Sequence, residues 1–312
     1  MARARRTRGS RHREYLLHLP PGHDRLHPLP LVMVLHGCAQ DHRDIQWISG
    51  FDAIADREGF AVVYPHVTSY SGIRFRNCWG WWQPGEIRPG EGEVQDLWHI
   101  IEDVRAGHAI DPRRIHVCGL SSGAGMAVAA MVAHCDRIAS GAAVAGVPYS
   151  EQARAVRFPG SRSPRYKPVE RVAQAMNAAM GQRKRAVPLF VVHSQDDEVV
   201  GIQAAMNLRD SWAQCFGVDT TAPVSRRAGR SGGIAWRHEA YRRERNRRPT
   251  IETLFVAGGG HGWFGGERGE FSYPDGPDVS RLLWAFFRRH PLAPETLERS
   301  ESRAGVFSRR AG

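Results

Sequence analysis

Long apolar segments and paired-cysteine motifs are absent from this chain of 312 residues. No apolar run reaches membrane-spanning length, so we expect no transmembrane segment. The five cysteines form no Cys-x-x-Cys pair and have no zinc-like spacing to histidine, so we expect no metal site. Residues 1–13 are rich in arginine, but no apolar segment follows them, and no secretory signal is visible in the chain as written.

Acidic residues are too few to balance the basic ones, and the formal charge is +11. The arginine excess gathers in residues 3–13, 183–185 and 226–248. Such clusters bind nucleic acid or an anionic surface in some proteins. No nucleic-acid-binding motif accompanies them here. We therefore interpret them as a solvated basic surface and expect no nucleic-acid partner.

Short apolar runs alternate with helical patterns along the chain. We expect strands at residues 15–19, 29–35, 60–64, 115–120, 138–145, 189–193, 236–241 and 251–256, and a surface loop at 219–235. This alternation predicts an α/β fold, a mostly parallel sheet with helices on both faces. We expect one catalytic domain over residues 14–292. The basic arm 1–13 and the charged tail 293–312 are expected to lack fixed structure.

The strongest motif is Gly119-Leu120-Ser121-Ser122-Gly123, which fits Gly-x-Ser-x-Gly. An apolar strand precedes it and a helix of small residues follows. A serine on such a sharp strand-to-helix turn is exposed, with the helix N–H groups directed at it. Ser121 is therefore the predicted nucleophile.

A nucleophilic serine needs a histidine to accept its proton and an acid to orient that histidine. With this turn the chain order is serine, acid, histidine. The loop after residues 189–193 offers Asp197 as first choice, Asp196 as second and Glu198 as third. His261, among glycines after a late strand, is the predicted base. His238 and His290 fit less well, because one lies among arginines and the other ends a helix.

An oxyanion hole needs two backbone N–H donors. We expect one from Ser122, directly after the nucleophile, and the other from Cys38 in the loop after an earlier strand. Four tryptophans are candidate substrate contacts: Trp79, Trp81, Trp82 and Trp263. The competing interpretation is a hydrophobic plug beneath a long loop.

Four segments together carry a family resemblance: residues 36–40 (His-Gly-Cys-Ala-Gln), 77–81 (Asn-Cys-Trp-Gly-Trp), 119–124 and 259–263 (Gly-Gly-His-Gly-Trp). In this order they resemble the polyhydroxybutyrate depolymerase-type esterases, a group related to feruloyl and acetylxylan esterases. The resemblance covers roughly residues 14–290. It implies an α/β-hydrolase fold and a serine esterase, and its acid position falls on Asp197.

The resemblance also implies a disulfide between Cys38 and Cys78, against the alternative of two free thiols in a reducing compartment. The chain departs from the family pattern at Ser194, where glycine is usual. The resemblance suggests an extracellular or periplasmic protein, although no export signal is visible.

The chain is thus expected to hydrolyse carboxylic esters without a metal or organic cofactor. Poly(3-hydroxyalkanoate), or more simply its soluble oligomers, is the first substrate class. Feruloyl or acetylxylan esters are the alternative. A basic nucleic-acid or anionic-surface binding protein on an inactive hydrolase scaffold is the alternative of another class. The sequence does not indicate an oligomeric state.

Overall fold

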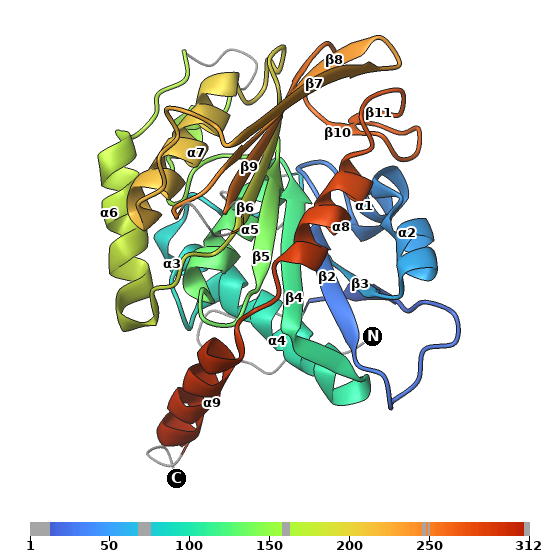
Figure 1. Cartoon of the computed structure of the whole chain (residues 1–312), viewed down its shortest axis with the longest axis vertical. Helices are drawn as coiled ribbons and strands as arrows, with labels where there is room; N and C mark the ends of the chain where they lie inside the picture. Colours follow the sequence, from blue (N-terminus) through green and yellow to red (C-terminus); the bar gives the residue numbers. More distant parts are fainter. Residues whose placement is uncertain (1–12, 68–75, 158–162, 245–247, 249, 309–312) are drawn as a thin grey trace.

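The computed structural model describes residues 13–67, 76–157, 163–244, 248 and 250–308. Within them, a nine-stranded sheet runs through the centre in the order β1-β3-β2-β4-β5-β6-β9-β8-β7 (Figure 1). Its strands are β1 (Tyr15–His18), β2 (Leu29–Leu35), β3 (Ala61–Pro65), β4 (Ile110–Leu120), β5 (Ser140–Val144), β6 (Leu189–Ser194), β7 (Ser225–Ser231), β8 (Ile234–Tyr241) and β9 (Ile251–Ala257). Two short strands, β10 (Trp263–Phe264) and β11 (Ser272–Tyr273), pair separately.

The centre of the sheet is parallel and its edges are antiparallel. Six neighbouring strands, β3 to β9 in the spatial order, pair in parallel. At the edges, β1 pairs antiparallel with β3, and β8 pairs antiparallel with β9. The predicted mostly parallel sheet is confirmed. Its consequence is that the carboxyl ends of β2, β4, β6 and β9 meet at one edge, where the loops that follow them gather.

Helices cover both faces of the sheet, as predicted (Figure 1). The helices are α1 (His42–Ser49), α2 (Phe51–Glu58), α3 (Pro84–Ile87), α4 (Gly92–Gly107), α5 (Ser122–Ala133), α6 (Val169–Met180), α7 (Ile202–Phe216), α8 (Val279–Arg289) and α9 (Pro294–Ser308), with 3₁₀ turns at Ala153–Ala155 and Gly181–Arg183. One core packs α4 to α7 on one face, and a second packs α1, α2 and α8 on the other.

The two cores explain why the central strands are apolar throughout. In β2, Leu31 and Met33 belong to the core with α4 to α7, whereas Val32 and Val34 belong to the core with α8. Side chains of a strand alternate between faces, so a strand covered on both faces needs an apolar residue at every position.

Residues 225–231 form a strand where the sequence analysis expects a surface loop. Strand β7 pairs antiparallel with β8 across a two-residue turn. Gly232 and Gly233 in this turn have φ values of 51° and 85°. A tight hairpin needs this left-handed backbone, which glycine adopts without steric penalty. The arginines of β7 are mostly exposed, and their charge conceals the strand in the sequence.

Helix α9 corrects the expectation of a tail without fixed structure over Pro294–Ser308, and residues 309–312 of that tail lie outside the described residues. Leu292, just before the helix, is fully buried, and its N–H donates to the carbonyl of Arg113. The Ser300 hydroxyl donates to Asp136 at 3.1 Å. Figure 1 shows α9 projecting from the end of the sheet opposite the β7–β8 hairpin. These contacts with β4 and the loop after α5 order a segment that composition alone classes as disordered.

The basic arm also ends earlier than expected, because Arg13 belongs to the fold. Its side chain is buried and pairs with Glu93 at 3.1 Å and with Asp96 at 3.0 Å, both on α4. The other carboxylate oxygen of Glu93 accepts the N–H of Gly80 at 2.7 Å. Arg13 therefore joins the start of the chain to α4 and to the tryptophan-rich loop. Residues 1–12 of the expected arm lie outside the described residues.

Replacing Arg13 by methionine is expected to lower the free energy of unfolding by about 3–5 kcal/mol, since it removes a buried cation that pairs with two buried carboxylates. The matched control is Arg57→Met, because Arg57 is half exposed and pairs with Glu58 at 3.5 Å. That surface pair should contribute less than about 1 kcal/mol. Urea unfolding of both variants provides the measurement. Equal small losses in the two would contradict a structural role for the buried pair.

Candidate active site

Ser121 stands on a sharp turn between β4 and α5. Its φ is 56° and its ψ is −116°, a conformation that few non-glycine residues adopt. Its N–H donates to the carbonyl of Val144 at 2.9 Å, which fixes the turn against β5. Ser122 opens the helix, so its N–H has no acceptor within the helix. The turn thus presents the Ser121 side chain next to the positive end of a 12-residue helix.

The two glycines of the motif are required by close backbone contacts. A Cβ on Gly119 would lie 2.6 Å from the carbonyl oxygen of Gly123. A Cβ on Gly123 would lie 2.4 Å from the carbonyl oxygen of His36. Real Cβ atoms do not approach backbone oxygen this closely, so both positions need glycine. The result is that β2, β4 and the start of α5 pack directly against one another around the serine.

Asp197 and His261 meet although 64 residues separate them. The His261 Nδ1 lies 2.7 Å from Asp197 Oδ2. Asp197 Oδ1 accepts the N–H groups of Val199 and Val200 at 2.9 and 2.8 Å. Burial by itself would raise the pKa of Asp197, but the hydrogen bond and charge of His261, the nearby His193 and the Val200 N–H together lower it. The carboxylate is therefore ionised at neutral pH and is held facing the imidazole.

The structure does not bring the other candidate acids to His261. Asp196 and Glu198 are exposed, while Asp197 is only 5 % exposed. Asp196 instead accepts the N–H of Gly258 at 2.6 Å, which secures the loop that carries His261. The other candidate histidines are also engaged elsewhere. His238 bonds Glu252 at 2.8 Å, and His290 bonds the carbonyl of Phe286.

Two residues at the end of β6 support this arrangement and were not singled out as functional in the sequence analysis. His193 is fully buried, its Nε2 donates to the carbonyl of Val200 at 2.6 Å, and burial lowers its pKa. This bond closes the loop around Asp197. The Ser194 hydroxyl donates to the carbonyl of Gly259 at 3.1 Å, so the residue that departs from the family pattern ties the acid loop to the His261 loop. The signal in the sequence is their position at the end of the strand that leads into the acid loop.

A cavity of about 450 Å³ lies over these residues, and both Ser121 and His261 line it. Cys38 and Ser122, the predicted oxyanion donors, line it too. The rest of the wall is largely apolar and includes Trp81, Trp82, Val147, Val156, Val199, Val200 and Phe271. A concave apolar site with a few convergent polar groups is the usual form of a small-molecule site.

The loop after β2 is organised by His36, which is fully buried. The Val67 N–H donates to His36 Nε2 at 3.2 Å, so the proton is on Nδ1, which donates to the carbonyl of Gly37 at 2.8 Å. Burial lowers the pKa of His36 to about 3, so the ring is neutral. In a trans peptide the C=O and the following N–H point in opposite directions. Fixing the Gly37 carbonyl therefore turns the Cys38 N–H away from His36.

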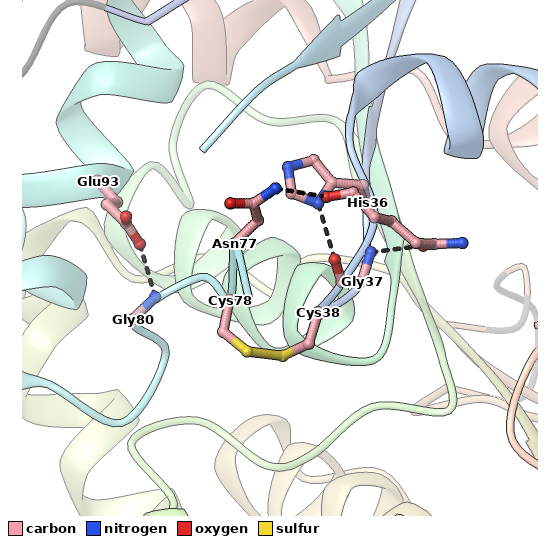
Figure 2. Close-up of a disulfide and its surroundings, with 8 residues drawn as sticks. His36, Gly37, Cys38, Asn77, Cys78, Gly80 and Glu93 are labelled. Carbon is pink, nitrogen blue, oxygen red and sulfur yellow. Dashed lines mark hydrogen bonds between the residues drawn. A yellow bond between two sulfur atoms is a disulfide. The ribbon is translucent and has the colours of Figure 1, made fainter. Parts of the chain in front are cut away.

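The disulfide implied by the family resemblance is present between Cys38 and Cys78 (Figure 2). It joins the loop after β2 to the tryptophan-rich loop. Two further bonds lie beside it: the Asn77 side chain donates to the carbonyl of Gln40, and the Ala39 N–H donates to that of Arg76. The bridge closes 40 residues, which the chain-entropy account values at about 4 kcal/mol. Both loops at this side of the cavity are thus fixed to each other.

Only two of the four candidate tryptophans reach the cavity. Trp81 and Trp82 line it, with their rings 5.2 Å apart. Trp81 packs on α5 where Gly125 leaves room, since a Cβ there would lie 2.8 Å from the ring. Trp79 and Trp263 are fully buried and do not line the cavity, which corrects their expected contact with substrate. Trp79 packs near His36, and Trp263 donates to the Ser280 hydroxyl in the opposite core.

Comparison with known proteins places this geometry in a family. The sequence profile described as "Esterase PHB depolymerase" matches residues 13–233. The chain belongs to this family. Among curated relatives, the poly(3-hydroxyalkanoate) depolymerase C of Paucimonas lemoignei is 30 % identical over 75 % of this chain and 55 % of its own length. A feruloyl esterase B of Thermothelomyces thermophilus is 26 % identical over 63 % of this chain and 68 % of its own. The match to this family member spans about half of the length of the Paucimonas lemoignei depolymerase.

Solved structures show the same fold. An acetyl xylan esterase from Aspergillus awamori superposes with a TM-score of 0.63 at 17 % identity, covering 80 % of this chain and 89 % of its own. An esterase named PE8 superposes with a TM-score of 0.51 at 15 % identity, covering 88 % and 99 %. At these identities the likeness concerns the fold, and the fold is that of the α/β-hydrolases.

None of the described helices is both long and apolar enough to cross a membrane. No group of three or more His, Cys, Asp or Glu side chains in this part of the chain is placed to hold a metal ion.

Proposed function

We propose that this member of the family is a serine hydrolase of carboxylic esters, with Ser121, His261 and Asp197 as its catalytic triad. The observation that carries the proposal is the 2.7 Å bond from His261 to a buried Asp197, at the cavity that Ser121 also lines. Membership in an esterase family supports the choice of ester over other acyl substrates.

In the proposed reaction the Ser121 hydroxyl attacks the ester carbonyl while His261 Nε2 takes its proton. Asp197 holds the proton on Nδ1 and stabilises the imidazolium. The N–H groups of Cys38 and Ser122 bind the oxyanion, each worth roughly 3 kcal/mol of transition-state stabilisation. The imidazolium then protonates the leaving alcohol, and a water molecule activated by His261 releases the acyl group from Ser121.

For the substrate we infer 3-hydroxyalkanoate esters, soluble oligomers before solid polymer, with feruloyl or acetylxylan esters as the second class. The largely apolar cavity wall, with Trp81 and Trp82, suits the aliphatic segments of such esters. The name of the Paucimonas lemoignei relative supports the first class, and that of the Thermothelomyces thermophilus relative supports the second.

An active-site phosphonate tests the proposed nucleophile directly. We expect a fluorophosphonate to add once per chain, on the peptide that contains Ser121, and hydrolysis of p-nitrophenyl butyrate to fall in proportion to labelling. Intact-mass and peptide mass spectrometry locate the adduct. The control is the protein unfolded in urea, in which Ser121 should lose its reactivity. A label on another residue, or full labelling with undiminished hydrolysis, would refute the assignment.

A further inference from the structure

The charges that line the active-site cavity are of one sign. Of the 19 described residues that line it, none is aspartate or glutamate, whereas Arg76 and Arg157 both contribute. The catalytic acid Asp197 is shielded behind His261 and does not line the cavity. A cavity whose wall carries guanidinium groups and no carboxylate attracts an anionic ligand over a neutral one. Neither arginine takes part in the proposed hydrolysis.

Arg157 is fixed beside the catalytic acid through its backbone. Its N–H donates to the carbonyl of Val199 at 2.8 Å, and the N–H of Val199 donates to Asp197 Oδ1. The segment that carries Arg157 therefore lies against the loop that orients His261. Its neighbours Ala153 and Val156 line the cavity with it. The guanidinium thus belongs to the wall of this cavity and not to a distant surface.

The Arg157 guanidinium has no carboxylate partner among the residues that the structure describes. Arginines elsewhere in the fold do: Arg13 pairs with Glu93 and Asp96, and Arg226 pairs with Glu239 at 2.7 Å. The segments that the structure leaves undescribed contain no aspartate or glutamate in their sequences. Arg157 is exposed and keeps its donors available to a ligand in the cavity. Arg76 is engaged in a further interaction and is the weaker candidate.

We propose that the cavity takes an ester whose chain ends in a free carboxylate, and that Arg157 binds this carboxylate while Ser121 attacks the ester. The inference rests on the proposed ester hydrolysis and specifies the substrate for that same site. A guanidinium presents two parallel N–H donors that match a carboxylate, which makes arginine better suited to this contact than lysine. Oligomers of a hydroxy acid have such an end, whereas acetyl groups on a polysaccharide do not.

Arg157 should distinguish the ester bond at the carboxyl end of a substrate from the ester bonds in its interior. An ester bond deep inside a polymer has no charge nearby, so Arg157 adds nothing to its binding. The ester bond next to the free carboxyl end brings the charge within the cavity. The enzyme should then remove units from the carboxyl end of soluble oligomers, and Arg157 should determine this preference as a specificity residue without affecting the chemistry at Ser121.

The test uses the full chain and two trimers of 3-hydroxybutyrate, the free acid and its terminal primary amide. They contain the same ester bonds and differ in one charge. We expect the native protein to hydrolyse the acid with a kcat/KM about five- to tenfold above that of the amide. Raising the salt from about 0.02 to 0.5 M should reduce this preference, because screening weakens the ion pair. Product release is followed by chromatography.

Three variants complete the test. Arg157→Gln should bring the acid and the amide within about twofold of each other, and Arg157→Lys should retain part of the preference. The matched control is Arg154→Gln, since Arg154 is exposed in the same segment and does not line the cavity. It should behave as the native protein does. Arg154→Gln should also hydrolyse p-nitrophenyl butyrate, a neutral ester, as the native protein does, and circular dichroism with urea unfolding shows that each variant is folded.

The outcomes separate this inference from the proposed function. If the native protein hydrolyses p-nitrophenyl butyrate but treats acid and amide alike, the carboxylate inference is wrong and the esterase assignment remains. If the preference survives in Arg157→Gln, the assignment to Arg157 is wrong. If no ester is hydrolysed by the native protein, the proposed function itself is wrong, and the inference falls with it.

Discussion

Replacing Ser121 by alanine is expected to lower kcat for p-nitrophenyl butyrate by about a millionfold, the scale seen when a triad nucleophile is removed. The substitution removes the hydroxyl on the turn between β4 and α5, next to the helix N-terminus. The neighbouring hydroxyl belongs to Ser122, which begins the helix itself. The folded structure should persist. Alanine and serine have the same backbone cost at a φ of 56°, so the free energy of unfolding should change little.

The adjacent serine provides the control for this prediction. Ser122→Ala removes a hydroxyl that is buried and has no hydrogen-bond partner, but it leaves the backbone N–H in place. If Ser122 acts through that N–H, kcat should stay within about tenfold of the native value. Steady-state kinetics and urea unfolding of both variants measure kcat and the free energy of unfolding. Comparable activity in Ser121→Ala and the native protein would exclude Ser121 as nucleophile.

The side chains of the proposed triad could be named from the sequence because their placement depends on chain order. In a parallel sheet each strand ends at the same edge, so residues directly after β4, β6 and β9 must come close together. The sequence shows the three strands as apolar runs and the three side chains just beyond them. Side-chain type, order along the chain and sheet topology are therefore sufficient to propose Ser121, Asp197 and His261 from the sequence.

The tryptophans show that the order of residues along the chain does not predict which side chains of a loop face the cavity. Trp79 and Trp81 are two residues apart in one loop, yet the first packs under His36 and the second faces the cavity. No periodicity applies in an irregular loop, so sequence proximity to Cys78 could not tell which ring is exposed to substrate. Trp263 follows His261 closely, but it enters β10 and points into the core with α8.

Whether an arginine is exposed or buried is difficult to predict from the sequence for a related reason. Arg13 resembles the solvated arginines before it, but its partners Glu93 and Asp96 lie 80 and 83 residues away in sequence. In β7 the arginines suggested a loop, although Gly232 and Gly233 were a visible hairpin signal. A charged side chain is exposed in most cases, but an oppositely charged partner that lies far away in the sequence can bury it. The same limit applied to Arg157, whose place at the cavity depends on the unpredicted pairing of its backbone with Val199.

Replacing Asp197 by asparagine is expected to lower kcat by about 10⁴-fold while leaving the site's geometry intact. The hydrogen bonds of the structure give the reason. Asp197 Oδ1 accepts two backbone N–H groups, from Val199 and Val200, so the oxygen of an asparagine would remain there. The amide NH₂ would then face His261 Nδ1, and the proton of the imidazole would move to Nε2. In that tautomer Nε2 cannot accept the Ser121 proton.

The matched control is Asp196→Asn, one residue away. Asp196 accepts the Gly258 N–H at 2.6 Å, a bond that the asparagine oxygen can also accept, so kcat should stay within about tenfold. Kinetics on p-nitrophenyl butyrate give the size of the two effects, and ¹⁵N NMR of the His261 ring gives the tautomer. If Asp197→Asn were harmless and Asp196→Asn severe, the acid would have been assigned to the wrong residue.

The pH dependence of activity supplies a further check on Asp197. The pKa of Asp197 is lowered in the folded protein, so its ionised form is favoured by folding. That stabilisation is complete above the ordinary aspartate pKa and is lost only as the pH falls through the lowered value. Asp197 should therefore stay ionised at pH values near the ordinary aspartate pKa. Because asparagine cannot ionise at any pH, the loss of activity in Asp197→Asn should persist across the whole pH profile of kcat/KM, and recovery of activity at alkaline pH would contradict the role proposed for Asp197.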